Sequence, residues 1–273
     1  MELQTPPTNL TPLLDTDILR YEIGYGAETG WNAITEGREQ IPPFHYVEDL
    51  LLKRIESIKT TCNTTIKPRL FMTEGKTFRY DLAKTKPYKG TRVEKKPWHY
   101  DNLTVYMRDV LGAEVVTGIE ADDRIAIEHV ASKETTIVCS RDKDFRQLPG
   151  WSYSWELGKQ PSFGPICITR EGTLKLSADH KKLIATGLVA FYGQVLTGDR
   201  VDNIPGLGKC GPVAAFSILS ETDNMYAAVR EAYSGVHHTD WEPHLLEQGR
   251  LCWLTRNLNK DGSPVLWSLG QEE

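Results

Sequence analysis

Apolar positions in this chain fall partly into helical spacing and partly into short continuous runs. Helical spacing predicts helices over residues 44–60, 98–111 and 122–131. Short apolar or β-branched runs predict strands over residues 13–19, 66–72, 115–116 and 135–139, the first running into a loop. Because strands and helices alternate, we expect an α/β fold with a mostly parallel sheet flanked by helices. Such sheets bind ligands at the carboxyl ends of their strands.

The last third of the sequence has a different pattern. Leu183–Leu196 predicts one apolar helix, and a glycine-rich turn, Pro205–Gly211, separates it from a second helix that Pro212 can begin. We therefore expect an α/β part over residues 1–182 and a smaller helical part over residues 183–273.

Composition excludes several classes of protein. Hydrophobic residues make up 40% and charged residues 25%, and no apolar stretch reaches the roughly 20 residues of a membrane span. The N-terminus lacks the basic start and apolar core of a secretory signal. Five scattered cysteines without CxxC spacing favour a reduced, cytoplasmic protein. The net charge of -5 taken alone argues against a nucleic-acid partner, but it is an average over the chain and does not show where the charges lie.

Carboxylates follow all four predicted strands and also open the glycine turn. They are Asp15, Asp17, Glu74, Glu120, Asp122, Asp123, Asp142, Asp144, Asp199 and Asp202. Any one of them alone could be a helix cap or a turn residue, and Asp17 fits a surface or outer-shell role equally well. As a set they need counter-charge, because two like charges about 4 Å apart repel by roughly 4 kcal/mol at an effective dielectric of 20. Oxygen ligands favour Mg²⁺ or Mn²⁺, and a pair of such ions can activate a phosphodiester.

Basic residues gather in a segment interleaved with tyrosines. It contains Arg79, Lys84, Lys86, Lys89, Arg92, Lys95 and Lys96, with Tyr80 and Tyr88. The segment is either a solvated basic loop or a surface that holds phosphates. A helical turn would place Lys89 and Arg92 on one face.

The glycine turn contains Gly206, Gly208, Lys209 and Gly211. Closely spaced glycines before a helix let backbone N–H groups approach a phosphate, although the same pattern also suits a packing corner between helices. The turn does not follow a strand, so a Rossmann dinucleotide site is not expected.

Five motifs together resemble the 5′-to-3′ exonuclease and flap endonuclease family. They are GKTFRYDL, PYKGTR, IEADD, SRDKDFRQLP and TGDRVDNIPGLGKCGP, in this order. The family includes the 5′ nuclease domain of bacterial DNA polymerase I and stand-alone bacteriophage exonucleases. The resemblance implies a PIN-like core, a helical arch over about residues 79–97 and a helix–hairpin–helix (helix–three-turn–helix) lobe. It also implies two Mg²⁺ or Mn²⁺ ions and a DNA substrate with a 5′ end or 5′ flap.

The resemblance also implies roles for individual residues. Asp15, Glu120 and Asp122 correspond to ligands of a first metal, and the second metal is held, directly or from an outer shell, by Asp123, Asp142, Asp144, Asp199 and Asp202. Lys89 and Arg92 correspond to catalytic residues that engage the scissile phosphate. The remaining DNA contacts are expected from Arg79, Tyr88, Lys95, Lys96, Gly206, Gly208, Lys209 and Gly211, with K⁺ at the glycine turn. A monomer in a bacterial cytoplasm, acting in DNA replication or recombination, is expected.

One position departs from the family pattern. Met72 stands where the common bacterial pattern has an Asp, and we expect Glu74 to replace that carboxylate. Two other functions stay open at this point. LLDTDIL and GDRVDN also resemble motifs of haloacid-dehalogenase-type phosphatases, and a catalytically silent DNA-binding protein would keep only the basic features.

Overall fold

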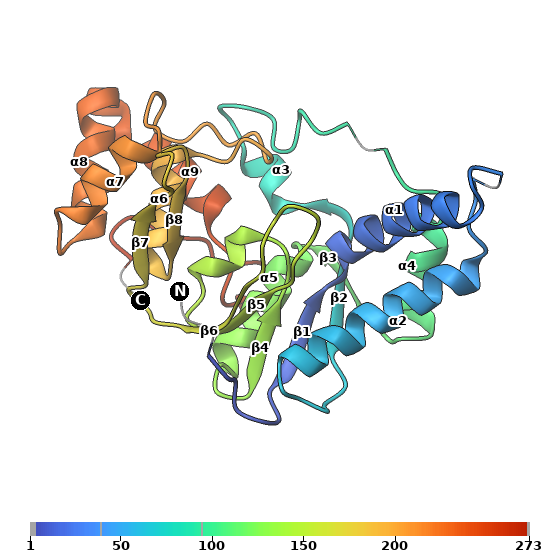
Figure 1. Ribbon diagram of the computed structural model, residues 1–273. Helices are drawn as coiled ribbons and strands as arrows, with labels where there is room; N and C mark the ends of the chain where they lie inside the picture. Colours follow the sequence, from blue (N-terminus) through green and yellow to red (C-terminus); the bar gives the residue numbers. More distant parts are fainter. Residues whose placement is uncertain (1–3, 39, 94, 272–273) are drawn as a thin grey trace. The chain divides into compact units, whose positions relative to one another are not determined.

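The computed structural model describes residues 4–38, 40–93 and 95–271 (Figure 1). The chain forms two compact units. The first contains the residues up to Gly75, those between Val93 and Asp144, and Gly150–Cys167. The second contains Lys76–Val93, Asp144–Pro149 and the chain from Ile168 onward. The basic segment up to Val93 therefore clusters with the second unit, whereas the sequence suggested the first.

A six-stranded sheet of order β3-β2-β1-β4-β5-β6 forms the centre of the first unit. Its strands are β1 (Thr11–Asp15), β2 (Arg69–Thr77), β3 (Glu114–Gly118), β4 (Thr136–Cys139), β5 (Gly150–Ser154) and β6 (Phe163–Ile168). β1 runs parallel to both β2 and β4, with Asp15 opposite Phe71 and Leu14 opposite Cys139. The carboxyl ends of these strands therefore lie at one edge, as the sequence predicts.

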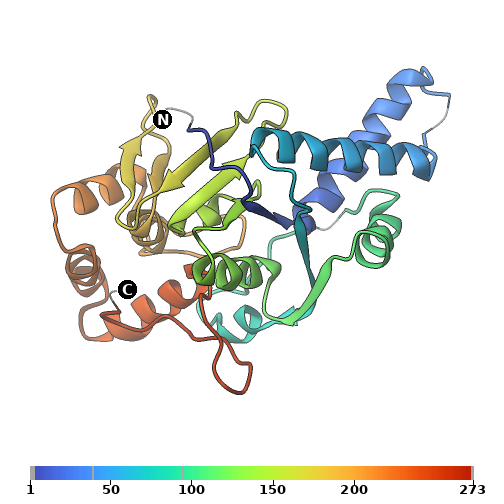
Figure 2. The same cartoon turned by 90° about the horizontal axis from the view of Figure 1, so that it is seen from below.

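Helices α1 (Thr16–Ile34), α2 (Phe44–Thr61), α4 (Tyr100–Asp109) and α5 (Ala121–Ala131) accompany this sheet. α1 and α2 lie side by side, and α5 packs against β1 and β4 (Figure 2). A buried cluster joins Leu14, Met72 and Ile137 of the sheet to Leu19 of α1 and Leu103 of α4. This mostly parallel sheet with flanking helices confirms the predicted α/β fold.

The three helices predicted for this unit from apolar spacing are confirmed, but α1 is not among the predicted elements. Its first residues, 16–19, belong to the stretch that the sequence pattern predicts as a strand running into a loop. In the structure, β1 ends at Asp15, whose Oδ1 atom accepts a hydrogen bond of 2.9 Å from the Asp17 N–H and so caps the new helix. The carboxylate at the end of the strand thus also begins the helix.

The second unit is mainly helical, with one small antiparallel sheet. Its elements are α3 (Phe78–Leu82), the 3₁₀ turn η1 (Lys143–Gln147), β7 (Thr173–Leu176), β8 (Leu183–Thr186), α6 (Leu188–Thr197), α7 (Pro212–Ser220), α8 (Met225–His237), the 3₁₀ turn η2 (His238–Asp240) and α9 (Trp241–Cys252). Phe191, Val195, Tyr233 and Leu245 belong to its buried core.

Two expectations for this unit are wrong. The apolar run at 183–196 is not one helix, because Gly187 at φ +66° separates β8 from α6 and β8 pairs with β7. The arch expected over about residues 79–97 is helical only at its start, in α3, since the described residues 83–93 and 95–99 contain no helix. Pro87 and Pro97 interrupt the stretch, and a proline disfavours helix in its neighbourhood. Across the described residues, no helix is both long enough and apolar enough to span a membrane.

Candidate active site

Asp15 is a buried carboxylate of the first unit whose pKa is raised. It is 3% exposed at the end of β1, and its Oδ2 atom accepts a 3.0 Å hydrogen bond from the Ser140 hydroxyl. The pKa of Asp15 is raised to about 7, chiefly by burial and then by the charges of Asp17 and Asp142. The hydrogen bonds from Ser140 and from the Asp17 N–H act in the opposite direction. Among the described residues, no basic side chain forms an ion pair with Asp15. A hard divalent cation would supply that missing charge.

Ser140 connects the ends of β1 and β4. Besides donating to Asp15, its hydroxyl oxygen accepts a 3.0 Å hydrogen bond from the Asp142 N–H. Asp142 is thereby placed next to Asp15, as the strand-end pattern predicts. Sequence reasoning missed Ser140, although its position between a buried strand and Asp142 was the available signal.

The start of α5 carries three of the expected carboxylates. Glu120 is the N-cap, and Asp123 completes a capping box in which its Oδ2 atom accepts the Glu120 N–H at 3.1 Å. Asp122 lies in the same first turn and is half-buried. The Ala121 N–H donates to Thr73 Oγ1 at 2.8 Å and so ties this turn to β2. Carboxylates are favoured here by the helix dipole, which makes a capping role compatible with metal ligation.

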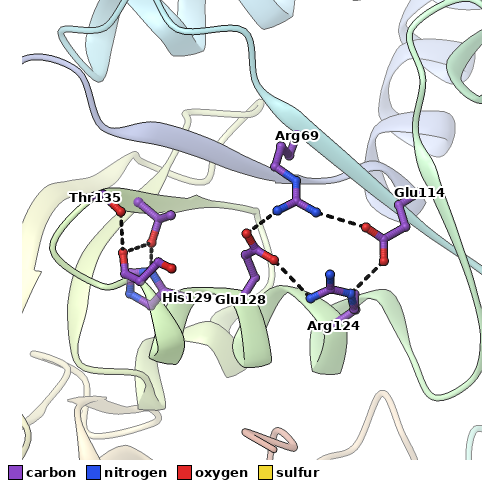
Figure 3. Close-up of polar contacts among 8 residues, drawn as sticks. Arg69, Glu114, Arg124, Glu128, His129 and Thr135 are labelled. Atoms are coloured by element: carbon purple, nitrogen blue, oxygen red, sulfur yellow. Dashed lines mark hydrogen bonds and ion pairs between the residues drawn. The ribbon is translucent and has the colours of Figure 1, made fainter. Parts of the chain in front are cut away.

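A closed ring of four alternating charges braces α5 against the sheet (Figure 3). Arg69 bonds to Glu114 at 3.1 Å and also to Glu128, while Arg124 bonds to Glu114 at 2.7 Å and to Glu128 at 3.2 Å. Both guanidinium groups lie over the Phe71 ring, at 5.2 and 5.7 Å. Partly exposed ion pairs contribute little to stability individually. As a ring they fix how α5 presents its first turn.

Glu74 does not take the place that the sequence suggested. Met72 is buried in the core at 2% exposure, and Glu74, two residues on, is exposed. Glu74 lines a hollow of about 250 Å³ with Arg20 and Arg108. Thr73, between them, is the residue of β2 that reaches α5. Because side chains alternate along a strand, Met72 and Glu74 face the side of β2 opposite to Thr73, so Glu74 is directed away from the first turn of α5. This placement does not favour Glu74 as a direct replacement for the missing Asp.

Asp17 is committed to contacts inside the first unit. It forms an ion pair with Arg20, and its two oxygens accept the Thr73 N–H at 3.1 and 3.2 Å. The structure therefore favours the outer-shell role that the sequence left open for Asp17.

In the second unit, Asp144 and Asp199 share one amide group. The Gln194 Nε2 atom donates to Asp144 Oδ1 at 3.0 Å and to Asp199 Oδ2 at 3.2 Å. Asp199 is only 4% exposed, and its other oxygen accepts the Val201 N–H at 2.7 Å. Gln194 thus holds the two carboxylates near each other. It was missed because it lies inside an apolar helix and carries no charge.

Asp202 is held by the basic segment. Its carboxylate accepts a hydrogen bond of 2.9 Å from the Tyr88 hydroxyl and pairs with Arg92 at 2.5 Å. The Lys89 N–H donates to the Asp202 carbonyl at 2.9 Å, and the Asn203 side chain donates to the Pro87 carbonyl at 2.8 Å. Two of the expected catalytic residues are thereby fastened to an expected metal ligand.

Lys89 and Arg92 reach this arrangement through a turn and not through a helix. Lys89 has φ +53°, the Gly90 N–H donates to Pro87 at 3.0 Å, and the Arg92 N–H donates to Lys89 at 3.1 Å. The expectation that a helical turn aligns Lys89 and Arg92 is therefore wrong. Their shared placement depends instead on the loop around Asp202.

We expect Asn203→Ala to loosen the Pro87–Arg92 turn. The change removes the bond to Pro87, and Asn is also among the residues that best tolerate the φ of +60° found at this position. Trypsin should therefore cut after Lys89 and Arg92 faster than in the wild type, whereas the melting temperature should fall only slightly. Asn203→Gly removes the same bond but keeps a residue that tolerates this φ. If trypsin cuts both variants no faster than the wild type, the bond from Asn203 to Pro87 does not hold the turn.

Several expected DNA contacts are placed in different environments. Arg79 is 2% exposed, and its guanidinium donates to the carbonyls of Leu251 and Trp253, at 3.2 and 2.7 Å. Tyr88 is 4% exposed and bonded to Asp202. Both therefore serve the packing of the second unit and do not form a DNA surface. Lys95, Lys96, Gly208, Lys209 and Gly211 are exposed, as a binding role requires.

The glycines of the turn between α6 and α7 divide into two kinds. Gly206, at φ +64°, is buried, donates to Gln248 at 3.0 Å, and a Cβ there would lie 2.4 Å from the Gly198 nitrogen. Gly208, at φ +75°, has nothing within 4 Å of such a Cβ. Gly206 is therefore a packing residue, and Gly208 is open to a ligand.

We expect Gly206→Ala and Gly208→Ala to differ in stability. Both incur roughly 1–2 kcal/mol for a left-handed backbone, but only Gly206→Ala also forces backbone atoms apart. Urea unfolding should therefore show the larger loss for Gly206→Ala. If Gly208 approaches a DNA backbone, Gly208→Ala should in addition weaken duplex binding at a temperature where it is folded. Equal stability losses in the two variants would contradict the assignment.

The structure thus brings Asp142 and Asp17 close to Asp15 in the first unit, and holds Asp144 near Asp199 in the second. Within the described residues, no three His, Cys, Asp or Glu side chains have the spacing of a metal site. The donor atoms at both places are carboxylate oxygens, and among the described residues no basic side chain forms an ion pair with the buried Asp15. These residues therefore fit Mg²⁺ or Mn²⁺ better than a soft metal.

Comparisons with known proteins give a structural likeness. No family model and no curated protein matches the sequence. A zinc-bound bacteriophage T5 5′-exonuclease has 14% identity and a TM-score of 0.60, covering 90% of this chain and 89% of that chain. T5 D15 protein crystallised with metal ions has 14% identity, a TM-score of 0.56 and the same coverage. T5 D15 flap endonuclease, in a pseudo-enzyme–product complex with DNA and metal ions, has 12% identity and a TM-score of 0.54, covering 90% and 99%. At such identities the likeness establishes a shared fold.

Proposed function

We propose that this protein is a divalent-metal-dependent 5′ nuclease that hydrolyses phosphodiester bonds at or near DNA 5′ ends. The observation that carries the proposal is Asp15, a buried carboxylate without a counter-charge, placed beside Asp142 at the carboxyl edge of a sheet. The fold shared with T5 nucleases, which are described with metal ions and DNA, supports the same reading.

In this proposal the carboxylates hold two Mg²⁺ or Mn²⁺ ions. Asp15, Glu120 and Asp122 would hold the first, and the second would be held or oriented by Asp123, Asp142, Asp144, Asp199 and Asp202. When bound, two such ions activate a water molecule and neutralise the charge of the phosphate under attack. Ser140 would keep Asp15 oriented, and Gln194 would keep Asp144 and Asp199 oriented.

Lys89 and Arg92 would hold the oxygens of the scissile phosphate. A guanidinium and an ammonium placed where negative charge develops stabilise the transition state more than the ground state. The turn around Gly208, Lys209 and Gly211 would hold the duplex backbone with K⁺. The protein would act as a monomer in a bacterial cytoplasm on intermediates of DNA replication or recombination.

The test is cleavage of a duplex with a 5′-labelled flap. We expect cleavage with Mg²⁺ or Mn²⁺ and none in EDTA, with Ca²⁺ supporting binding but little turnover. Blunt duplex with a 5′ phosphate separates exonuclease from flap endonuclease preference. Intact DNA under all metal conditions, with measurable DNA binding, would leave the silent DNA-binding protein as the answer.

The phosphatase alternative is less compatible with the site. Its nucleophile would be Asp15 and its proton donor Asp17, yet Asp15 is buried and Asp17 is paired with Arg20. Release of phosphate from a small phosphomonoester such as p-nitrophenyl phosphate would favour that alternative.

A further inference from the structure

Trp98 exposes a large aromatic surface at the end of the basic segment. Trp98 is 66% exposed, and no other tryptophan among the described residues is similarly exposed. Leaving an aromatic side chain in water forgoes roughly 1.5–3 kcal/mol of burial. A single exposed apolar residue is common, so exposure alone does not define a site.

The backbone that carries Trp98 is fixed to α1. The Tyr25 hydroxyl donates to the Lys95 carbonyl, and the Trp98 N–H donates to a Glu28 carboxylate oxygen at 2.6 Å. Pro97 is buried against Gly24, where a Cβ would lie 2.4 Å from the Pro97 ring. Three positions on α1 thus contact three of the four residues from 95 to 98.

The other side of Trp98 is fixed as well. His99 is 7% exposed and its Nε2 atom lies 2.7 Å from the Pro42 carbonyl, and α4 begins at the next residue. The indole is therefore presented from an anchored backbone on both sides. A ligand that contacts it would order little additional chain on binding, which lowers the entropic cost.

The charges near Trp98 suit a polyanion. Lys95 and Lys96 are exposed, and the Lys96 ammonium lies 4.4 Å from the centre of the Tyr100 ring. Of the nearby carboxylates, Glu28 accepts the Trp98 N–H, and Asp101 lies on α4 beyond it. Exposed lysines next to an exposed aromatic ring match the chemistry of single-stranded nucleic acid, in which phosphates alternate with unstacked bases.

We propose that Trp98 stacks on an unpaired base of single-stranded DNA, with Lys95 and Lys96 contacting the flanking phosphates. The inference rests on the proposed function and adds a site for the unpaired part of the substrate. Bases of a blunt duplex are stacked on one another and cannot use the ring. The contact would therefore favour a 5′ flap over a blunt end.

The experiment measures binding of fluorescently labelled dT oligonucleotides in EDTA, so that no cleavage occurs. Base stacking on an aromatic residue contributes roughly 1–3 kcal/mol, so Trp98→Ala should weaken binding about 5- to 150-fold. Trp98→Phe should restore much of the loss, because it keeps a stacking face. Val105→Ala is the matched control, since Val105 is a 49% exposed apolar residue on α4 and should bind like wild type.

Salt and duplex measurements complete the test. Trp98→Ala should keep the wild-type salt dependence, whereas Lys95→Ala and Lys96→Ala should each lower its slope by about 0.7. Affinity for a blunt duplex should not change in Trp98→Ala. Unchanged dT affinity in Trp98→Ala, or an equal loss for blunt duplex, would overturn the proposal.

The outcome is separable from that of the proposed function. If the protein fails to cleave flaps but Trp98→Ala loses dT binding, the single-strand site stands and the nuclease proposal falls. If wild type cleaves flaps and Trp98→Ala binds dT normally, the nuclease proposal stands and the single-strand site falls.

Discussion

Asp15→Asn is expected to stabilise the metal-free protein at pH 8 while removing nearly all of the proposed nuclease activity. The pKa of Asp15 is raised to about 7 in the folded protein, chiefly by burial, whereas the unfolded chain has an ordinary Asp near 3.8. Between these values the folded state binds a proton that the unfolded state has lost. Stability contributed by this group therefore falls as pH rises from about 4 to about 7.

At pH 8 an ionised, buried Asp15 lowers the free energy of unfolding, on the order of 1–4 kcal/mol. Asn at this position removes the charge and still accepts a hydrogen bond. Urea unfolding in EDTA should show the variant more stable than wild type at pH 8, with a clearly smaller difference at pH 5. A variant less stable at pH 8 would contradict the assignment of Asp15 as an uncompensated charge.

Metal binding should make the wild type more stable than Asp15→Asn at pH 8. Mg²⁺ should raise the melting temperature of the wild type more at pH 8 than at pH 5, because protonated Asp15 is a poor ligand. Asp15→Asn should respond less to Mg²⁺ at either pH. Cleavage of the flap substrate should fall by roughly 100-fold or more. A destabilising carboxylate that is needed for activity is the trade-off expected at a functional site.

The sequence predicted the first unit well wherever apolar residues recur with one clear period. α2 and α5 have such a stripe, and both were predicted within one residue of each end. The clustering of Asp15 with Asp142 also followed from sequence, because parallel strands of one sheet bring their carboxyl ends to one edge. These predictions needed only the local spacing of apolar residues and the rule that parallel strands end at one edge of their sheet.

Contacts between distant residues could not be predicted in this way. Ser140 bonds to Asp15 across 125 positions, and Tyr88 bonds to Asp202 across 114. Such partners are uncharged or aromatic and carry no spacing signal. Arg79 was misassigned for the complementary reason, since a buried Arg satisfied by carbonyl groups looks like a surface Arg in a sequence. A charge becomes a DNA contact only when burial and partners leave it accessible.

Replacing Arg92 is expected to slow the chemical step more than it weakens DNA binding. Arg92 pairs with Asp202 at 2.5 Å and belongs to the turn that Asp202 and Asn203 hold. In the proposed mechanism its guanidinium also faces the phosphate as charge develops. Arg92→Ala should therefore lower the single-turnover rate at saturating flap DNA by roughly 100-fold or more, with a smaller change in duplex affinity measured in Ca²⁺.

Two further variants identify which property of Arg92 matters. Arg92→Lys keeps the charge and loses the planar fork, so it should recover only part of the rate if Arg92 must bind Asp202 and phosphate together. Lys84→Ala is the control within the same basic segment, because the Lys84 ammonium donates to the nearby Asp81 carbonyl at 2.8 Å and should not affect the rate. A wild-type rate in Arg92→Ala would show that the basic segment is only a solvated loop. Equal losses of rate in Lys84→Ala and Arg92→Ala would instead indicate that positive charge attracts DNA in general. General attraction predicts the same loss for either side chain, whereas a specific contact with the phosphate predicts a loss for Arg92 alone.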